Sequence, residues 1–295
     1  MDPRHLELLR RLDELGSVTA VARATYRTPS AVSQQLKQAA RELGHTLVEP
    51  EGRGLKLTTA GRLLAAGGKD VASAIARVQA DWEDYLGEAS GDVRIAGLPS
   101  ALTYLMPAAL QQLRKTSPGI VLTADDVDLA EHEFAALTSD VDIVIAHSLV
   151  SARPAATEGL TVESLARERI DVAMSDEHRL AGRDELSPGD LVNDRWVSVP
   201  EDYPFATIMS SIEQVTGCEL EVTQRIRDNR LIEAIVASGD HLALLPRFTT
   251  PHNAGLTLVP LSGVSATRWI VAVMAPDTAE RAAVKRVLEA LRANA

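Results

Sequence analysis

The sequence has 295 residues, of which 45% are hydrophobic and 24% charged, as in a globular chain long enough for a small domain plus a larger one. The apolar runs are too short to span a membrane and the N-terminus lacks the apolar core of a signal peptide, so we expect a cytoplasmic protein without membrane contacts. The single cysteine, Cys218, excludes a disulfide within one chain and is expected to be an ordinary packed side chain.

The net charge of −11 is unevenly distributed along the chain. Residues 1–62 hold ten basic and seven acidic residues, a net charge of +3, whereas the remaining residues carry −14. A basic N-terminal part on an acidic body is typical of a DNA-binding domain attached to a domain that avoids DNA. A chance fluctuation would give the same numbers, so charge alone does not decide.

Three short helices are predicted at the N-terminus. Asp2-Pro3 is a cap followed by a first-turn proline, and Gly16 is a typical C-terminal residue. Ser17 or Thr19 is expected to cap a second helix. Thr28-Pro29 repeats the start signal for a third helix, which runs to Gly44 with apolar residues at helical spacing (Val32, Leu36, Ala39 or Ala40, Leu43).

The opposite face of the third helix carries Ser30, Ser33, Gln34, Lys37 and Arg41, and no acidic residue lies between Pro29 and Arg41. Short hydroxyls and an amide can reach base edges, and basic groups can contact phosphates. A solvated helix face is the alternative interpretation, although such faces usually mix charge signs.

A short two-stranded wing is predicted after this helix. Leu47-Val48 and Leu55–Leu57 flank a turn at Glu51–Gly54 whose tip is basic, and Thr58 or Thr59 then caps another helix. Two helices joined by a tight turn and followed by a wing indicate a winged helix-turn-helix.

The residues of this region resemble the LysR-type transcriptional regulators, on the segments Gly16-Ser17, Ala22, Ser30–Leu36, Leu43-Gly44, Leu47, Arg53 and Leu57–Gly61. The chain departs from the family pattern at Thr25, Arg27, Ala40, Val48 and Pro50. On this basis we expect Pro29, Ser30, Ser33 and Gln34 to read bases, and Thr28, Lys37, Arg53 and Thr59 to contact phosphates.

A long helix is predicted from Thr59 to about Leu86. Leu64, Val71, Ile75, Val78, Trp82 and Tyr85 follow the spacing of a short coiled-coil seam, which a second chain is expected to cover. Gly67-Gly68 is interpreted as a bend or a close helix contact, and the segment 87–91 as a hinge.

Residues 92–295 alternate apolar strand runs with amphipathic helices, which favours parallel α/β layers. The strands are expected at 93–96, 120–123, 142–145, 170–174, 196–199, 242–245 and 269–274. The helices are expected at 104–114, 204–216, 230–238 and 278–293.

The resemblance extends into this part, through Asp92–Ile95, Leu105–Pro107, Ser117–Gly119, Asp142–Ile145, Val236–Gly239 and Leu244–Pro246, which are similar to landmarks of the LysR effector domain. It implies an α+β protein overall, with an all-α winged helix-turn-helix at 1–60 and a linker helix with its hinge at 61–91. Residues 92–295 then form a two-lobed α/β effector domain resembling periplasmic solute-binding proteins. Lobe I covers about 92–155 and 266–295, and lobe II about 160–264.

The effector is expected between the two lobes, where loops after strands and helix N-termini hold ligands. Ser100, Ala101 and Thr103 begin a helix after the first strand, and hydroxyls and N–H groups there can receive a carboxylate. The remaining candidates are Val127 after the second strand, His147 at a strand end, and Glu201 and Asp202 in the second lobe. The acids favour a ligand with an amino or guanidino group, whereas helix caps, polar loops and a structural His147 are the alternatives.

The sequence contains no phosphate-cradling loop, no nucleophile elbow and no paired histidines, so we expect no cofactor, no metal and no catalysis. The resemblance implies a transcription regulator whose binding to double-stranded promoter or operator DNA is modulated by a small-molecule effector. It also implies self-association as a dimer of dimers and allows a contact with RNA polymerase. A solute-binding protein and an enzyme on an α/β fold remain the alternative classes.

Overall fold

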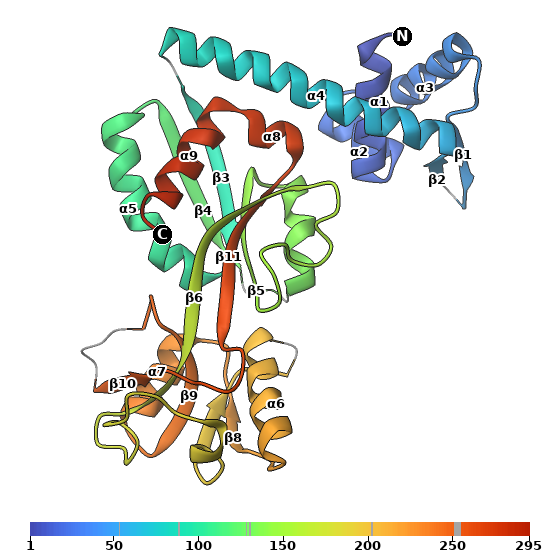
Figure 1. Ribbon diagram of the computed structural model, residues 1–295. Coiled ribbons are helices and arrows are strands. Elements are labelled where there is room, and N and C mark those ends of the chain that lie inside the picture. The colour runs from blue at the N-terminus through green and yellow to red at the C-terminus, as the bar shows by residue number, and fades with distance from the viewer. Residues whose placement is uncertain (53, 88, 128, 130, 202, 251–254) are drawn as a thin grey trace. The chain divides into compact units, whose positions relative to one another are not determined.

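The computed structural model describes residues 1–295 except 53, 88, 128, 130, 202 and 251–254 (Figure 1). The chain divides into two compact units: residues 1–91 with 275–285, and residues 92–274 with 286–295. The boundary at Gly91 coincides with the end of the segment 87–91 that the sequence singles out as a hinge. The first unit is therefore discontinuous in sequence.

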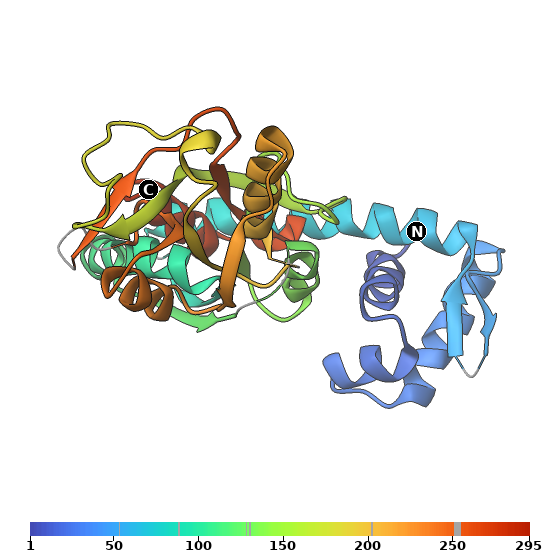
Figure 2. The ribbon, with the colours of Figure 1, turned by 90° about the horizontal axis from the view of Figure 1, so that it is seen from below.

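Up to Gly91, the first unit has the order of elements that the sequence predicts. It contains α1 (Pro3–Leu15), α2 (Val18–Ala24), α3 (Pro29–Leu43), the strands β1 (Val48–Glu51) and β2 (Gly54–Leu57), α4 (Thr59–Leu86) and the short α8 (Pro276–Glu280). The two strands pair antiparallel, with Val48 opposite Leu57, and form the small hairpin seen beside the helices in Figure 2. The predicted winged helix-turn-helix architecture is confirmed.

Side-chain caps start each of the four N-terminal helices. Asp2, Ser17, Thr28 and Thr58 accept backbone N–H groups of the first turns, which have no partner inside the helix. The helices α1, α3 and α4 end at glycines with φ of 70°, where a residue without Cβ is favoured. The sequence left two helix caps open. The cap of α2 is Ser17 rather than Thr19, and the cap of α4 is Thr58 rather than Thr59.

The core of the first unit is formed by the inward faces of α1 to α4 and the hairpin, through Leu9, Val21, Val32, Leu36 and Leu47. Gly68 contributes to this packing because α1 passes close to α4 there. A Cβ at Gly68 would lie 2.6 Å from the carbonyl oxygen of Leu6, whereas nothing lies within 4 Å of a Cβ at Gly67. α4 is one helix from Thr59 to Leu86, so the glycine pair marks a close helix contact.

Replacing each of these two glycines with alanine should have opposite effects. Gly67→Ala should stabilise the first unit by up to about 1 kcal/mol, because alanine loses less backbone freedom in a helix. Gly68→Ala should destabilise it by about 1–3 kcal/mol, because its methyl group meets the α1 backbone. Thermal unfolding followed by circular dichroism compares the two variants, and equal shifts of the melting temperature would contradict the close contact.

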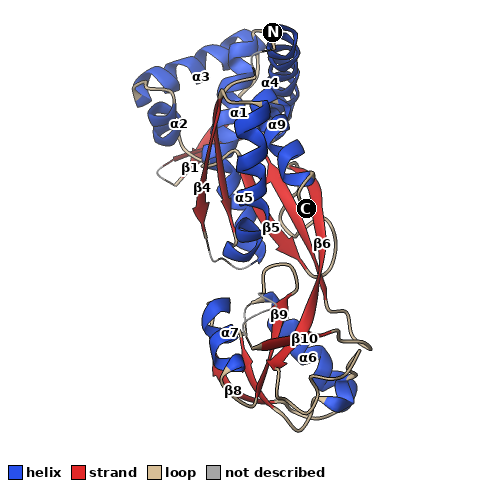
Figure 3. Cartoon of the chain, turned by 90° about the vertical axis from the view of Figure 1, so that its left-hand side faces the viewer, coloured by secondary structure: helices blue, strands red, loops and turns tan. Residues whose placement is uncertain are grey.

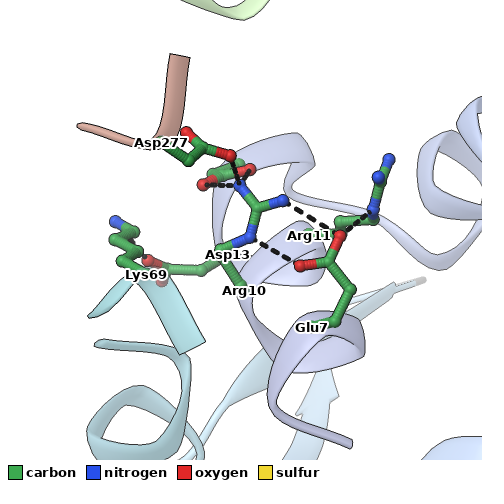
Figure 4. A network of polar contacts seen from close by, with 7 residues as sticks. Glu7, Arg10, Arg11, Asp13, Lys69 and Asp277 are labelled. Atoms are coloured by element: carbon green, nitrogen blue, oxygen red, sulfur yellow. Dashed lines mark hydrogen bonds and ion pairs between the residues drawn. The ribbon is translucent and has the colours of Figure 1, made fainter. Parts of the chain in front are cut away.

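A network of polar contacts joins α1 to α8 within this unit (Figure 4). The side chain of Arg10 is 10% exposed, and its guanidinium lies 2.8 Å from Glu7, 3.0 Å from Glu14 and 3.3 Å from Asp277. Lys69 of α4 also pairs with Asp13 of α1 at 3.3 Å. Arg10 is therefore a nearly buried cation that carboxylates from α1 and α8 surround.

The second unit is built on one continuous sheet in the order β4-β3-β5-β11-β6-β9-β7-β8, with β10 also paired to β6. Its strands are β3 (Gly91–Gly97), β4 (Ile120–Asp126), β5 (Ile143–Ser148), β6 (Thr161–Ser175), β7 (Arg195–Ser198), β8 (Glu221–Arg225), β9 (His241–Pro246), β10 (Leu256–Val259) and β11 (Thr267–Met274). The expected parallel pairing is found between β3 and β5 and between β7 and both β8 and β9. In contrast, β11 is antiparallel to β5 and β6, and β6 is antiparallel to β9.

The antiparallel strands β6 and β11 connect two lobes (Figure 3). Residues 161–169 of β6 pair with β11, and residues 170–173 pair with β9, so the strand passes from lobe I into lobe II near Ile170. Lobe I holds β3, β4, β5, α5 (Pro99–Thr116) and the 3-10 helix η1 (Glu131–Ser139). Lobe II holds β7 to β10, α6 (Pro204–Thr216), α7 (Asn229–Ala237) and η2 (Pro188–Asp190).

Several elements differ from the sequence expectations. The short strands β8 and β10 were not predicted; four of the five residues of β8 are exposed, and β10 has only four residues. α5 begins at Pro99, five residues before the expected start, and continues through Pro107. The expected helix 278–293 is divided into α8 and α9 (Ala282–Arg292), because Arg281 is extended with ψ of 134°. Within the described residues, none of the helices combines the length and the hydropathy needed to cross a bilayer.

Candidate functional site

The N-terminal half of α3 presents a surface of neutral side chains, most of them polar, and one cation, Lys37. Thr28, Pro29, Ser30, Gln34 and Lys37 are exposed, and Ser33 is half-buried. Thr28 caps the helix through its bond from the Ala31 N–H, and its hydroxyl lies 2.9 Å from that of Ser30. Val32 and Leu36 hold the opposite face in the core, so the packing of α3 fixes which side chains point outward.

The wing carries both signs of charge. The ammonium of Lys56 lies 3.6 Å from Glu49 and 3.3 Å from Glu51, so two carboxylates neutralise it. Arg53, the expected basic tip, lies outside the described residues. Thr59 is exposed at the first position of α4, next to the cap Thr58.

The second half of the apolar seam of α4 is left exposed by the described part of the chain. Ile75, Val78, Trp82 and Tyr85 are exposed along its second half, and the rings of Trp82 and Tyr85 stack at 5.5 Å. A contiguous exposed apolar stripe of this kind marks an interaction surface.

A cavity of about 690 Å³, called here the interlobe cavity, lies between the two lobes of the second unit. The helices α5 and α6 begin at its wall, each with proline at its first position and without a side-chain cap. From lobe I and β11 it is lined by Leu98, Pro99, Ser100, Thr103, Asp126, Leu129, His147 and Arg268. From lobe II it is lined by Val199, Tyr203, Pro204, Phe205, Arg227, Asp228, Asn229, Arg230, Glu233 and Thr249.

One lining residue of this cavity, Arg268, belongs to a buried ion pair. Arg268 and Glu168 are directly opposite each other on β11 and β6, and both are almost fully buried, at 1% and 0% exposed. The Arg268 guanidinium donates to Glu168 at 2.7 Å and to Ser100 Oγ at 3.0 Å, and the other Glu168 oxygen accepts the Phe248 N–H. Burial lowers the pKa of Arg268, and Glu168 opposes that shift.

His147, at the end of β5, is the second buried polar group of the wall. Its side chain is 7% exposed and lies edge-on to the rings of Phe134 and Phe205. Burial, together with the charge of Arg268, lowers its pKa to about 3, so the imidazole is neutral at physiological pH. Its Nδ1 has no hydrogen-bond partner in the described structure.

The structure brings together only part of the predicted effector set. Ser100, Thr103 and His147 line the cavity, whereas Ala101 is buried in the core and Val127 bonds through its N–H to Gly97 outside the lining. Glu201 lies outside this lining: its side chain is 82% exposed and pairs with Arg225 at 3.0 Å, on a separate groove that also contains Cys218. Asp202 lies outside the described residues.

Sequence reasoning missed the ion pair and the second-lobe lining. Arg268 directly precedes the apolar strand run 269–274, but its partner Glu168 is 100 residues away in the chain. The segment Arg227–Arg230, at the start of α7, was not considered because it reads as an ordinary helix cap, and Asp228 does cap that helix. Among the described residues, no group of three or more His, Cys, Asp or Glu side chains is placed to hold a metal ion.

Comparison with known families decides the identity of both units. Residues 86–295 match the LysR substrate binding domain, and residues 3–62 match the bacterial regulatory helix-turn-helix protein, lysR family. The chain belongs to the LysR family. As a LysR protein it is a DNA-binding transcriptional regulator with an effector-binding domain, as the resemblance of its sequence predicted.

Relatives of this LysR protein match along most of the chain. The transcriptional dual regulator GltC of Bacillus subtilis is 26% identical over 250 residues, covering 84% of this chain and 82% of GltC. Full-length OxyR from Pseudomonas aeruginosa has a similar fold, with a TM-score of 0.65, 16% identity and coverage of 100% and 99% of the two chains. CbnR in complex with its target DNA has a TM-score of 0.53 at 16% identity, covering 99% of this chain and all of CbnR.

Proposed function

We propose that this LysR protein acts in the cytoplasm as a promoter-binding regulator that reads DNA with the exposed face of α3. Pro29, Ser30, Ser33 and Gln34 contact base edges, and Thr28, Lys37, Arg53 and Thr59 contact phosphates. The observation that carries this assignment is the outward face of α3, which presents hydroxyls, an amide and a cation without any carboxylate between Pro29 and Arg41. A carboxylate there would be repelled by the DNA backbone.

A second copy of the chain covers the apolar seam of α4 in this proposal. The exposed Ile75, Val78, Trp82 and Tyr85 support it, because they need a hydrophobic partner that one chain does not provide. Paired recognition helices then read two half-sites in successive major grooves, and two such dimers form the tetramer. A further contact with RNA polymerase belongs to the same proposal.

The interlobe cavity is proposed as the effector site, with Ser100 and the start of α5 receiving a carboxylate. The uncapped helix N-terminus and the Ser100 hydroxyl support this, since both supply hydrogen-bond donors. Effector binding shifts the population of dimer arrangements and so changes the half-sites that are occupied. The protein regulates without catalysing a reaction, in keeping with the regulator names of its relatives.

Base reading by α3 is tested with Gln34→Ala, after selection of the preferred site from a random duplex library. The variant should bind the selected site about 5- to 150-fold more weakly than the wild type, because one good base contact contributes about 1–3 kcal/mol. Its affinity for random DNA should be almost unchanged. Lys37→Ala should instead weaken both DNAs and reduce the salt dependence by about one counterion.

Gln38→Ala is the matched control for Gln34→Ala. Gln38 is exposed on the same helix, but its amide already donates to Glu42 at 2.8 Å. Selected-site binding should therefore be nearly unaffected in this variant. Equal losses on selected and random DNA for Gln34→Ala and Lys37→Ala would contradict the separation into base and phosphate contacts.

A further inference from the structure

The part of the interlobe cavity around Ser100 offers hydrogen-bond donors that lack acceptors. Ser100 Oγ accepts a hydrogen bond from Arg268, so the hydroxyl hydrogen of Ser100 is available to a ligand. The first backbone bond within α5 runs from the Leu102 N–H to Leu98, which leaves the N–H groups of Ser100 and Ala101 without a partner inside the helix. The charge of Arg268 is already balanced by Glu168. This end of the cavity therefore suits one carboxylate.

His147 favours a second kind of chemical group on the ligand. His147 lines the cavity, and its Nδ1 is buried without a hydrogen-bond partner among the described residues, which is costly for a polar atom unless a ligand completes the hydrogen bond. The ring is neutral, so a charged ligand group placed against it would lose its hydration without gaining an opposite charge. A hydroxyl fits best, because it can donate or accept and thus pairs with either tautomer of the ring.

The residues that favour these two ligand groups lie close together. Phe205 at the start of α6 has its ring centroid 6.2 Å from that of His147 and 5.6 Å from the Cζ of Arg268. Since Arg268 is bonded to Ser100, the group that would hold the carboxylate and the imidazole ring of His147 both lie next to one aromatic ring. One small molecule with a short apolar body can reach both.

We propose that the effector is a hydroxy acid, whose carboxylate bonds to Ser100 and the start of α5 and whose hydroxyl bonds to Nδ1 of His147. This rests on the proposed function, because it takes the interlobe cavity as the effector site. It makes His147 the residue that distinguishes a hydroxy acid from the same acid without its hydroxyl. It also replaces the amino or guanidino ligand that the sequence favoured through Glu201, whose side chain faces solvent.

Isothermal titration calorimetry of the full-length protein with matched acids tests this proposal. The acids are benzoate with its monohydroxy isomers, and butanoate with its monohydroxy isomers. At least one hydroxy acid should bind about tenfold more tightly than its parent, the gain expected from one satisfied buried hydrogen bond. Ser100→Ala should weaken parent and hydroxy acid alike.

His147→Phe should abolish the preference, so that the hydroxy acid binds as weakly as its parent. His132→Phe is the matched control, because His132 is exposed on η1 and is not among the lining residues of the cavity. This control should keep the tenfold preference. If His147→Phe does not fold, His147→Leu provides the same comparison with a smaller apolar side chain.

Three results would overturn the proposal: equal binding of every parent and its hydroxy acids, a preference that survives in both His147 variants, or no binding of any acid in the panel. None of these outcomes depends on DNA. The Gln34→Ala measurement on selected and random duplexes is made without a ligand, so failure of the hydroxy-acid assignment and failure of the proposed function are separately visible.

Discussion

Replacing Arg268 with methionine should lower the free energy of unfolding by about 3–5 kcal/mol. The variant leaves Glu168 as a carboxylate that is 0% exposed and that, among the described residues, retains only the Phe248 N–H as a hydrogen-bond partner. The cost arises from this uncompensated buried charge more than from the loss of the ion pair itself. Chemical denaturation monitored by the fluorescence of the buried Trp196 would measure the change in the second unit.

Two further variants separate this explanation from a general packing defect. In the double variant Arg268→Met with Glu168→Met, both charges are removed, so most of the lost stability should return. Arg183→Met removes a partly exposed arginine that pairs with Asp190 at 3.3 Å and should change stability by less than about 1 kcal/mol. A double variant as unstable as Arg268→Met alone would show that the buried charge is not the cause.

Acidification should destabilise the protein through His147. Burial, followed by the charge of Arg268, lowers the folded-state pKa of His147 from 6.5 to about 3. Between these two values the unfolded chain takes up a proton that the folded chain does not. Stability is therefore fully present above pH 6.5 and falls as the pH decreases toward 3, by up to about 1.4 kcal/mol per pH unit.

The His147 contribution is measured by comparing denaturation midpoints of the wild type and His147→Phe at several pH values from 7 to 4. Other groups titrate in both proteins, so the difference between the two curves isolates His147. The wild type should lose stability more steeply, and the two curves should converge or cross as the pH falls. Parallel curves would mean that His147 has an ordinary pKa in the folded protein.

The N-terminal part of the fold is predictable from the sequence because its signals are local. Capping at Asp2 and Thr28, the glycines at helix ends, and the apolar spacing of Val32 and Leu36 each concern residues within a few positions of one another. The outward face of α3 follows from the same spacing. What the sequence left open at Gly67-Gly68 depended on how closely α1 passes, which is a tertiary contact.

The effector cavity was predicted only in part because its walls come from distant segments. Ser100 was recognisable as the start of a helix after a strand, whereas the register of β6 against β11 decides that Arg268 faces Glu168. A position directly after a strand does not determine the direction of a side chain. Glu201 pairs with Arg225 of β8 and lies outside the cavity lining. The parallel sheet was expected from the alternation of strands and helices, which does not reveal the direction in which β11 returns.

The discontinuity of the first unit has a consequence for how the protein is made. Residues 275–285, which include the Asp277 partner of Arg10, belong to that unit but are synthesised after the whole of residues 92–274. Helices α1 to α4 therefore leave the ribosome long before the segment that completes their surroundings. During that interval Arg10 can pair with Glu7 and Glu14 but not yet with Asp277, so the final state of the first unit is reached only when translation is nearly finished.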